Sequence, residues 1–396
     1  MKYVLSPYRA KDRVQDLFSQ FTAEKMTMVK KYHQTFPQYK ETPLHSLSGL
    51  AEYLGVKAVY VKDESYRFDL NAFKVLGASY AIARYIAQKE AISESEISYK
   101  KLLNSNLPQT VFTTTTDGNH GRGIAWTAKL LGQKAIVNMP KGTVSQRVKA
   151  IEELGAQVNV TDMNYDETVR LTAKQAEQEG RVIVQDTAWP GYEDIPLWIM
   201  KGYGTMAAEV YEKLPEAPTH VFVQAGVGSM AAAVIAALAN FYNEKPPVFI
   251  LMEAESAACF YRTAQVAKET PVAAEGELAT IMAGLACGEA SSLAWPIIRN
   301  YVDAYFSLAD VVAANGMRVL SSPKMNDPRI VSGESGAVGV GLLYALKQKP
   351  HKEIAKKIKL DQNSVVVMFS TEGATDEENY RKIVWNGKYP DCQSQE

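Results

Sequence analysis

From residue 58 onward, short runs rich in β-branched residues alternate with windows whose apolar residues recur at helical spacing. The strand-like runs cover residues 58–62, 110–114, 135–138, 157–160, 182–185, 220–223, 248–252 and 364–369. The helical windows between them include residues 120–131, 144–154, 166–179, 229–241 and 336–347. Strands separated by helices of this length are joined by right-handed crossovers. The pattern therefore predicts an α/β protein with mainly parallel sheets flanked by helices.

The alternation also predicts two domains. Residues 77–190 contain four compact β/α units, so the segments before and after this block must share another sheet. We expect a small substrate-side domain at 77–190 and a large, discontinuous cofactor-binding domain made of 1–76 and 191–396. A chain of 396 residues is long enough for both. Residues 1–40 are polar and aromatic-rich with loose periodicity, which suits an arm on the body or on a partner subunit.

Composition argues against several classes of function. Hydrophobic residues make up 46% and charged residues 22%, and a net charge of −1 without a basic block argues against nucleic-acid and anionic-membrane partners. No apolar run approaches the ~20 residues that span a bilayer. The N-terminus lacks the pattern of a signal peptide, so we expect a cytoplasmic protein. Three cysteines without CxxC spacing and five histidines without ligand spacing predict no metal site, and they leave open whether Cys259 and Cys287 pair.

The segment 71–74, Asn-Ala-Phe-Lys, lies between a strand-like run and the helical stretch 75–88. Lysine is the side chain whose amine can form a Schiff base with an aldehyde cofactor. Ligands of open parallel sheets lie beyond the carboxyl ends of strands, which is where Lys74 is placed. We therefore predict that Lys74 is catalytic and binds the cofactor. One lysine alone would carry little weight, but two glycine-bearing loops fit the same cofactor.

The first of these loops, residues 113–121, runs from a strand into a helix. Its hydroxyls, glycines and helix-start N–H groups are suited to a carboxylate. The predicted substrate-binding residues are Thr115, Thr116, Asp117, Gly118 and His120. Asn119 can donate to a phenolate-type oxygen of the cofactor, whereas Asp117 would repel a substrate carboxylate unless it carries a proton. Helix capping by Thr116 or Asp117 is the competing interpretation.

The second loop, residues 224–230, again leads from a strand into a helix of small residues. The residues predicted to surround a phosphate are Gly226, Val227, Gly228, Ser229 and Met230. The same letters match the G-x-G-x-x-A fingerprint of dinucleotide-binding proteins, with Glu253 at the end of the next strand. Taken alone, this loop is also compatible with an NAD-linked oxidoreductase or with a purely structural turn.

A third feature follows the last predicted strand, where Ser370 and Thr371 lie within residues 369–373. A hydroxyl at this point could bond a pyridine nitrogen without protonating it. A neutral nitrogen makes the ring a milder electron sink and favours elimination over transamination. Either hydroxyl could serve, and an ordinary strand-ending turn is the alternative.

Four motifs together, at 71–74, 117–120, 226–229 and 370–371, resemble the tryptophan-synthase-β-like, or fold type II, family of pyridoxal-phosphate enzymes. The resemblance extends from about residue 42 to 375 in the family's order. It implies a pyridoxal 5'-phosphate cofactor bound to Lys74, which later serves as a base, and Asn119 near the 3′-oxygen of that cofactor. A homodimer is also implied.

A narrower resemblance, carried by residues 115–123, 186–189, 284–289 and 370–373, is to family members that act on 2,3-diaminopropionate. It implies a carbon–nitrogen lyase that converts the D and L forms of this small amino acid to pyruvate and ammonia. Asp117 and Asp186 match acidic positions associated with acid–base work. Serine and threonine dehydratases of the same fold usually carry serine in place of Asp117, and they remain the nearest alternative.

Overall fold

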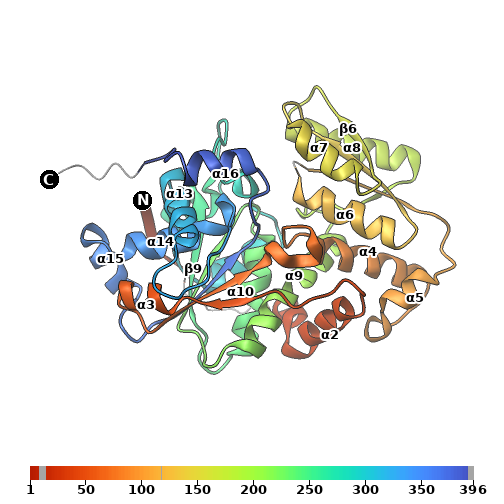
Figure 1. The fold of residues 1–396 in the computed structure, drawn as a ribbon. Coiled ribbons are helices and arrows are strands. Elements are labelled where there is room, and N and C mark those ends of the chain that lie inside the picture. The colour runs from red at the N-terminus through yellow and green to blue at the C-terminus, as the bar shows by residue number, and fades with distance from the viewer. Residues whose placement is uncertain (9–14, 117, 391–396) are drawn as a thin grey trace. The chain divides into compact units, whose positions relative to one another are not determined.

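The computed structural model describes residues 1–8, 15–116 and 118–390, and it forms two compact units (Figure 1). Unit 1 comprises Met1–Ala23, Glu41–Asn71 and Met206–Glu396, and unit 2 comprises Glu24–Lys40 and Ala72–Thr205. These units differ from the predicted division at 77–190. Residues 24–40 and 191–205 group with unit 2 because the helices that contain them pack inside it, as the buried bond from the Tyr32 hydroxyl to the Ser79 carbonyl (3.0 Å) illustrates.

Unit 1 contains a seven-stranded sheet in the order β1-β10-β9-β8-β11-β3-β2. Its strands are β1 (Lys2–Leu5), β2 (Leu44–Ser46), β3 (Ala58–Asp63), β8 (His220–Gln224), β9 (Val248–Ala254), β10 (Val302–Leu308) and β11 (Val365–Ser370). The five central strands run parallel, and β1 and β2 pair antiparallel at the two edges. The predicted mainly parallel sheet is therefore confirmed, although β1, β2 and β10 were not among the predicted strands.

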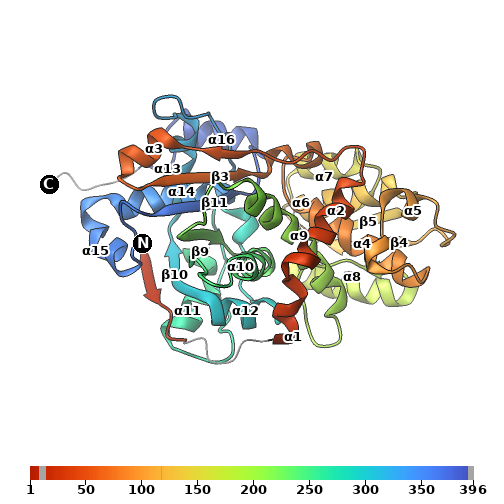
Figure 2. The ribbon, with the colours of Figure 1, turned by 90° about the horizontal axis from the view of Figure 1, so that it is seen from below.

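The two faces of this sheet are covered by different helices. Phe222, Ile250 and Met368 point into a core formed with α3, α13, α14 and α16, while their neighbours Val221 and Leu251 are buried on the opposite face. Strand side chains alternate between faces, so continuously apolar strands require cover on both sides. Figure 2 shows α13 and α14 on one side of the sheet and α10 and α12 on the other. The helices of unit 1 are α1 (Gln15–Phe18), α3 (Ser48–Leu54), α10 (Ser229–Phe241), α11 (Cys259–Gln265), α12 (Ala294–Tyr301), α13 (Asp310–Ser321), α14 (Glu334–Lys347), α15 (Lys352–Lys357) and α16 (Glu377–Val384).

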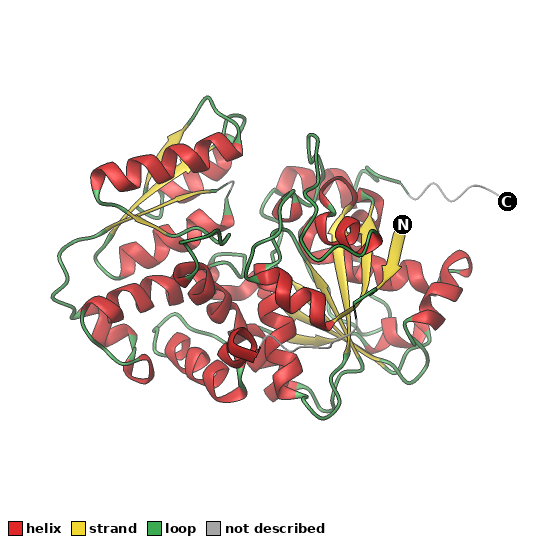
Figure 3. Ribbon diagram, turned by 180° about the vertical axis from the view of Figure 1, so that it is seen from behind, coloured by secondary structure: helices red, strands yellow, loops and turns green. Residues whose placement is uncertain are grey.

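Unit 2 contains a four-stranded, all-parallel sheet in the order β6-β5-β4-β7. Its strands are β4 (Val111–Thr115), β5 (Lys134–Met139), β6 (Gln157–Val160) and β7 (Val182–Ile183). Figure 3 shows its strands in yellow between red helices. The helices are α2 (Ala23–Gln34), α4 (Val75–Lys89), α5 (Tyr99–Leu103), α6 (Asn119–Leu130), α7 (Ser145–Glu152), α8 (Tyr165–Glu179) and α9 (Asp194–Lys213), whose last turns extend into unit 1. The four predicted β/α strands are all present.

A buried charge cluster underlies the segment that leads to Lys74. Arg67 donates to Glu64 and to Glu209, and Lys62 pairs with Glu209 at 2.5 Å, with every one of these side chains at 0% exposure. Thr42 donates to Glu64 at 2.7 Å. Buried charges are tolerated when they are paired and hydrogen-bonded. The cluster therefore anchors the 3-10 helix η2 (Glu64–Asp69), which precedes Lys74, onto β3.

The N-terminal residues are more regular than the predicted loose arm. Residues 2–5 form β1 at the edge of the large sheet, where Lys2 pairs with Ser307. Residues 23–34 form α2, in which His33 is fully buried and bonds to Thr205 at 2.7 Å. Among the described helices, none is both long and apolar enough to cross a membrane.

Candidate active site

Lys74 and Asp186 form an ion pair within unit 2. Lys74 immediately precedes α4, and its Nζ lies 2.5 Å from Oδ2 of Asp186, which follows β7. The Lys74 side chain is 24% exposed and that of Asp186 10%, so the pair is shielded without being sealed off. The structure thus brings together two predicted catalytic residues that are 112 positions apart in the chain.

The ionisation of Asp186 depends on this partner. Burial alone would raise the pKa of its carboxyl group, but the charges of Lys74 and His120 and the Lys74 hydrogen bond outweigh it and lower the pKa to about 2. A carboxylate next to a cation is favoured in its charged form. At neutral pH Asp186 is therefore an anion that holds the Lys74 amine in place.

The loop that carries Asp186 is held by its neighbours in sequence. The Gln185 N–H donates to the Tyr192 hydroxyl at 2.8 Å, and that hydroxyl donates to the Ile183 carbonyl at 3.1 Å. Trp189 stacks on Tyr192 with ring centroids 4.3 Å apart. These contacts close the chain into a tight turn behind Asp186, which restricts the positions its carboxylate can take. The sequence analysis did not assign Gln185 or Tyr192 to the site. Neither residue type carries a local pattern that would indicate a role in holding the Asp186 loop.

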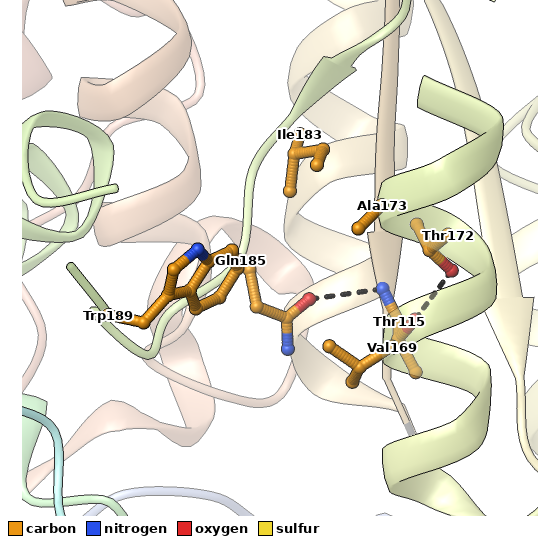
Figure 4. Close-up of a pocket in the computed structure, with 7 residues that line it drawn as sticks. All are labelled: Thr115, Val169, Thr172, Ala173, Ile183, Gln185 and Trp189. Carbon is orange, nitrogen blue, oxygen red and sulfur yellow. Dashed lines mark hydrogen bonds between the residues drawn. The ribbon is translucent and has the colours of Figure 1, made fainter. Parts of the chain in front are cut away.

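Thr115 ends β4 and is bonded internally. Its N–H donates to Gln185 Oε1 at 3.1 Å, and its hydroxyl bonds to the Thr172 hydroxyl at 2.7 Å (Figure 4). Figure 4 shows these residues beside Trp189 in a small depression, which is lined by Thr115, Val169, Thr172, Ala173, Ile183, Gln185 and Trp189. The N–H and hydroxyl groups of Thr115 are thus already engaged in hydrogen bonds that join β4 to the Asp186 loop and to α8. The predicted contact of Thr115 with substrate would have to replace or share these bonds.

The rest of the 113–121 loop leads into α6. The Thr116 hydroxyl accepts the Gly118 N–H at 3.1 Å, which is a bond within the turn before α6 and not a cap on a helical N–H, because Gly118 is itself the N-cap residue. Asn119 is the first residue of α6, and Asp117 lies outside the described residues. His120 is 2% exposed, and its Nε2 lies 2.8 Å from the Val184 carbonyl, two residues before Asp186. His120 therefore lies behind Asp186 and contributes to its low pKa, which is a supporting position in addition to the predicted contact with substrate.

In unit 1 the 224–230 loop joins β8 to α10 through a close approach of backbone. A Cβ on Gly226 would come 3.0 Å from the Gly284 carbonyl, and Gly228 has φ +92°, where a Cβ would lie 2.6 Å from Phe260. The left-handed backbone at Gly228 therefore requires glycine, and the close approach at Gly226 leaves little room for a side chain. The loop ends at Gly228, directly before the first turn of α10. Helix starts present N–H groups without intrahelical acceptors, so this loop is suited to a phosphate.

Ser370 and Thr371 are buried at the end of β11. The Ser370 hydroxyl donates to the Ser332 hydroxyl at 2.8 Å, whereas the Thr371 hydroxyl accepts from the Gln224 amide at 3.1 Å. Because Gln224 begins the glycine loop, this bond places the end of β11 beside that loop within unit 1. The Gly373 N–H donates to the Asn71 carbonyl at 3.1 Å, so the segment that leads to Lys74 starts next to the same strand end.

A comparison with known protein families identifies the family to which the chain belongs. A model of the family described as pyridoxal-phosphate dependent enzyme matches residues 35–371, which is most of the chain. The chain belongs to this family. The predicted fold type II architecture is thereby confirmed, and pyridoxal 5'-phosphate is its cofactor.

Within the pyridoxal-phosphate enzymes, the chain is 49% identical over 377 residues to a diaminopropionate ammonia-lyase from Escherichia coli strain K12, covering 94% of each chain. It is 45% identical to one from Salmonella typhimurium, covering 91% of this chain and 92% of the relative. A crystal structure of the Escherichia coli lyase in complex with D-serine matches with a TM-score of 0.91 at 45% identity, covering 98% of each chain. Another, in complex with an aminoacrylate-PLP azomethine reaction intermediate, matches with a TM-score of 0.89.

Both alternatives from the sequence are less well supported. The identity to a threonine dehydratase from Haemophilus influenzae is 26%, well below that to the lyases. Glu253, the acidic residue of the dinucleotide interpretation, is fully buried and accepts the N–H groups of Phe260 and Tyr261 at 2.8 and 2.7 Å. Its carboxyl group therefore caps the start of α11 and has no surface to offer to a ribose.

The residues present fit pyridoxal phosphate chemically. Unit 2 by itself contains an amine beside a carboxylate. Unit 1 by itself contains a glycine loop, in which a Cβ on Gly226 would approach the Gly284 carbonyl, and two buried hydroxyls at the neighbouring strand end. Cys259 and Cys287 do not form a disulfide with each other in this structure. Within residues 1–8, 15–116 and 118–390, no group of three His, Cys, Asp or Glu side chains is arranged to bind a metal ion.

Proposed function

We propose that this enzyme is a carbon–nitrogen lyase that eliminates ammonia from 2,3-diaminopropionate and yields pyruvate and ammonia. The observation that carries the proposal is the Lys74–Asp186 ion pair in a chain 49% identical to a diaminopropionate ammonia-lyase. The pair provides a basic amine and an anionic carboxylate at one place. The reaction needs both, because a proton leaves Cα and an amine leaves Cβ.

The cofactor residues are assigned from the sequence motifs, and the positions described above support the assignment. We assign the carbonyl-binding amine to Lys74, the 3′-oxygen contact to Asn119 and the ring-nitrogen contact to Ser370 or Thr371. The phosphate loop consists of Gly226, Val227, Gly228, Ser229 and Met230. When bound, pyridoxal phosphate draws electrons away from Cα of the amino acid and so makes its proton acidic.

Lys74 then takes the Cα proton. Its Nζ is held within hydrogen-bonding distance of Asp186, so this carboxylate orients the amine. Because Asp186 is ionised at neutral pH, its carboxylate can also bind a cationic β-amine and accept hydrogen bonds from the N–H groups of that amine. Ammonia, unlike amide anion, is a feasible leaving group, so the β-nitrogen must leave protonated. A carboxylate partner suits this requirement better than a hydroxyl.

Asp117, which lies outside the described residues, completes the proposal from sequence. Acceptance of both D and L substrates requires a proton acceptor on each face of the planar, cofactor-bound amino acid. Lys74 would hold the cofactor from one face, and its amine would act as the proton acceptor on that face. We assign Asp117 to the other face, and Thr116, Gly118 and His120 to the surroundings of the substrate carboxylate.

The substrate is a small amino acid, and the enzyme is proposed to act in the cytoplasm as a homodimer. The chain has no basic block and a net charge of −1, which gives nucleic acid or an anionic membrane nothing to bind. Two-fold dimers are the commonest closed assemblies of soluble proteins.

The test is a visible absorbance spectrum of the purified protein, followed by pyruvate release from D- and L-diaminopropionate. Serine and threonine serve as controls. A lyase releases pyruvate fastest from diaminopropionate. Faster turnover of serine or threonine would make the enzyme a dehydratase, and the absence of cofactor absorbance would overturn the proposal.

A further inference from the structure

Tyr203, which the assignments above do not use, is buried beside the Lys74–Asp186 pair in unit 2. Its side chain is 1% exposed, and within the described chain its hydroxyl has no hydrogen-bond partner. A buried polar group without a partner costs stability, so its persistence calls for a specific reason. The Tyr203 hydroxyl can therefore donate a hydrogen bond to an acceptor that comes within reach.

The packing places this hydroxyl near Lys74. The Tyr203 ring lies 4.8 Å from that of Phe73, the residue before Lys74, and a Cβ on Gly77 would come 2.8 Å from Cζ of Tyr203, which carries the hydroxyl. Gly77 lies one helical turn after Lys74, on the same side of α4. The phenol therefore packs against residues that lie on both sides of Lys74 in the sequence, Phe73 before it and Gly77 after it.

Two glycines make this approach possible. Gly77 leaves the space that the ring occupies, and a Cβ on Gly202 would collide with the Leu76 carbonyl. The helices α4 and α9 thus touch through their backbones, and the next residue of α9 is Tyr203. This packing is the structural reason for glycine at positions 77 and 202.

The electrostatic surroundings keep the phenol protonated. Burial raises the pKa of Tyr203 above its ordinary value, the charge of Lys74 lowers it and that of Asp186 raises it again. The net shift of this pKa is upward, so the phenol is protonated and can donate a hydrogen bond at neutral pH. Both charges of the ion pair act on this hydroxyl.

We infer that Tyr203 is a positioning residue that donates a hydrogen bond to Asp186 when Lys74 is bonded to the cofactor. The inference rests on the proposed function. A free lysine amine offers Asp186 up to three N–H donors, but a lysine nitrogen bonded to a carbonyl carbon keeps at most one proton. Asp186 is buried, so the loss of donors is costly unless another donor replaces them. Tyr203 is the donor that is already in place.

The test is the Tyr203→Phe variant, which removes the hydroxyl and keeps the ring. We expect its dissociation constant for pyridoxal phosphate, titrated by absorbance, to rise about tenfold, as the loss of a hydrogen bond to a charged group predicts. The cofactor-free variant should melt at or above the wild-type temperature, because an unpaired buried hydroxyl is removed. A melting temperature well below wild type would overturn the inference, since the hydroxyl would then have a partner without the cofactor.

A double-mutant cycle with Asp186→Asn identifies the acceptor. The effect of Tyr203→Phe on the cofactor dissociation constant should be much smaller in the Asp186→Asn background. An equal effect in both backgrounds would mean that the hydroxyl bonds another group and would overturn the inference. So would an unchanged dissociation constant, or a change confined to KM for the amino acid.

The matched control is Tyr380→Phe. Tyr380 lies in α16 of unit 1, is 8% exposed and also has a hydroxyl without a hydrogen-bond partner in the described part of the chain. We expect this variant to bind the cofactor as the wild type does, and a tenfold loss in it too would overturn the assignment to Tyr203. A wild-type protein that binds no pyridoxal phosphate would instead refute the proposed function itself, so the two failures are distinguishable.

Discussion

The amine of Lys74 lies 2.5 Å from the carboxylate of Asp186, although 112 positions separate the two residues in the chain. Lys74 is positioned by the start of α4, and Asp186 by the turn that Tyr192 closes after β7. Unit 2 therefore brings the two groups together through its own fold. Such preorganisation places the base where the reaction needs it.

Replacing Lys74 with alanine should remove both cofactor attachment and catalysis. Without the amine, nothing in this position can bond to the cofactor's carbonyl carbon or accept the Cα proton. We expect the visible absorbance near ~410–420 nm to disappear from the purified protein, since that band belongs to lysine-bound pyridoxal phosphate. Pyruvate release should fall by at least about 10³-fold. A variant with an unchanged spectrum would refute the assignment of this lysine.

Replacing Asp186 with asparagine should change the response of stability to acid. The pKa of Asp186 is lowered to about 2, so its contribution to stability is present above the ordinary aspartate pKa and is lost as the pH falls from about 4 to 2. At neutral pH this contribution is on the order of 2 kcal/mol. Urea unfolding at several pH values should show that the variant lacks this acid-dependent loss. Equal slopes for variant and wild type would contradict the ion pair.

The same variant should also lose activity. The carboxylate orients Lys74 and manages the proton of the departing amine, and such roles contribute about 10²–10⁴-fold to a rate. Steady-state pyruvate release, measured with both D- and L-diaminopropionate, checks this. Asp186→Glu is the control that keeps the charge, and it should retain more activity than Asp186→Asn.

Replacing Asp117 with asparagine should separate the two enantiomers. If Asp117 accepts the Cα proton on the face opposite Lys74, turnover of the D isomer should be abolished while that of the L isomer is reduced less. Parallel kcat measurements on the two substrates decide the matter. Equal losses would count against a division between two bases and would leave Asp117 with a shared role at the leaving group.

Replacing Glu209 with glutamine should destabilise unit 1. Glu209 lies at 0% exposure between Arg67 and Lys62, and its removal leaves two buried cations short of a partner. The cost of breaking a buried pair is about 3–5 kcal/mol. Urea denaturation measures it. Glu216→Gln is the control, because Glu216 pairs with Lys57 at the surface and its loss should cost less than about 1 kcal/mol.

Local sequence patterns were sufficient for the strands that carry the site. Strands β3, β4, β8 and β11 are short β-branched runs buried on both faces, so their composition alone marks them. Edge strands such as β1 and β2 carry no such signal, because they are short and only partly buried. Their pairing partners are remote in sequence, and local propensity does not encode remote pairing.

The motifs at residues 71–74, 224–230 and 370–371 were readable from the sequence because each needs a particular side chain or backbone conformation at one position. An amine is needed at Lys74, and a residue without a Cβ at Gly228. Such demands are local, so the residue type reveals them. The sequence by itself therefore determined the fold class and, through its resemblance to a family, the cofactor, whereas the loops assigned to that cofactor stay a prediction.

Only the tertiary structure decided which side chains act together. It paired Lys74 with Asp186, placed His120 behind that carboxylate and engaged Thr115 in bonds to its own unit. It also set Tyr203 beside Lys74, because Gly77 and Gly202 allow two helices to touch. The physical reason is that hydrogen bonds and charges act over a few ångströms in space, and distances along the chain do not report which groups come that close.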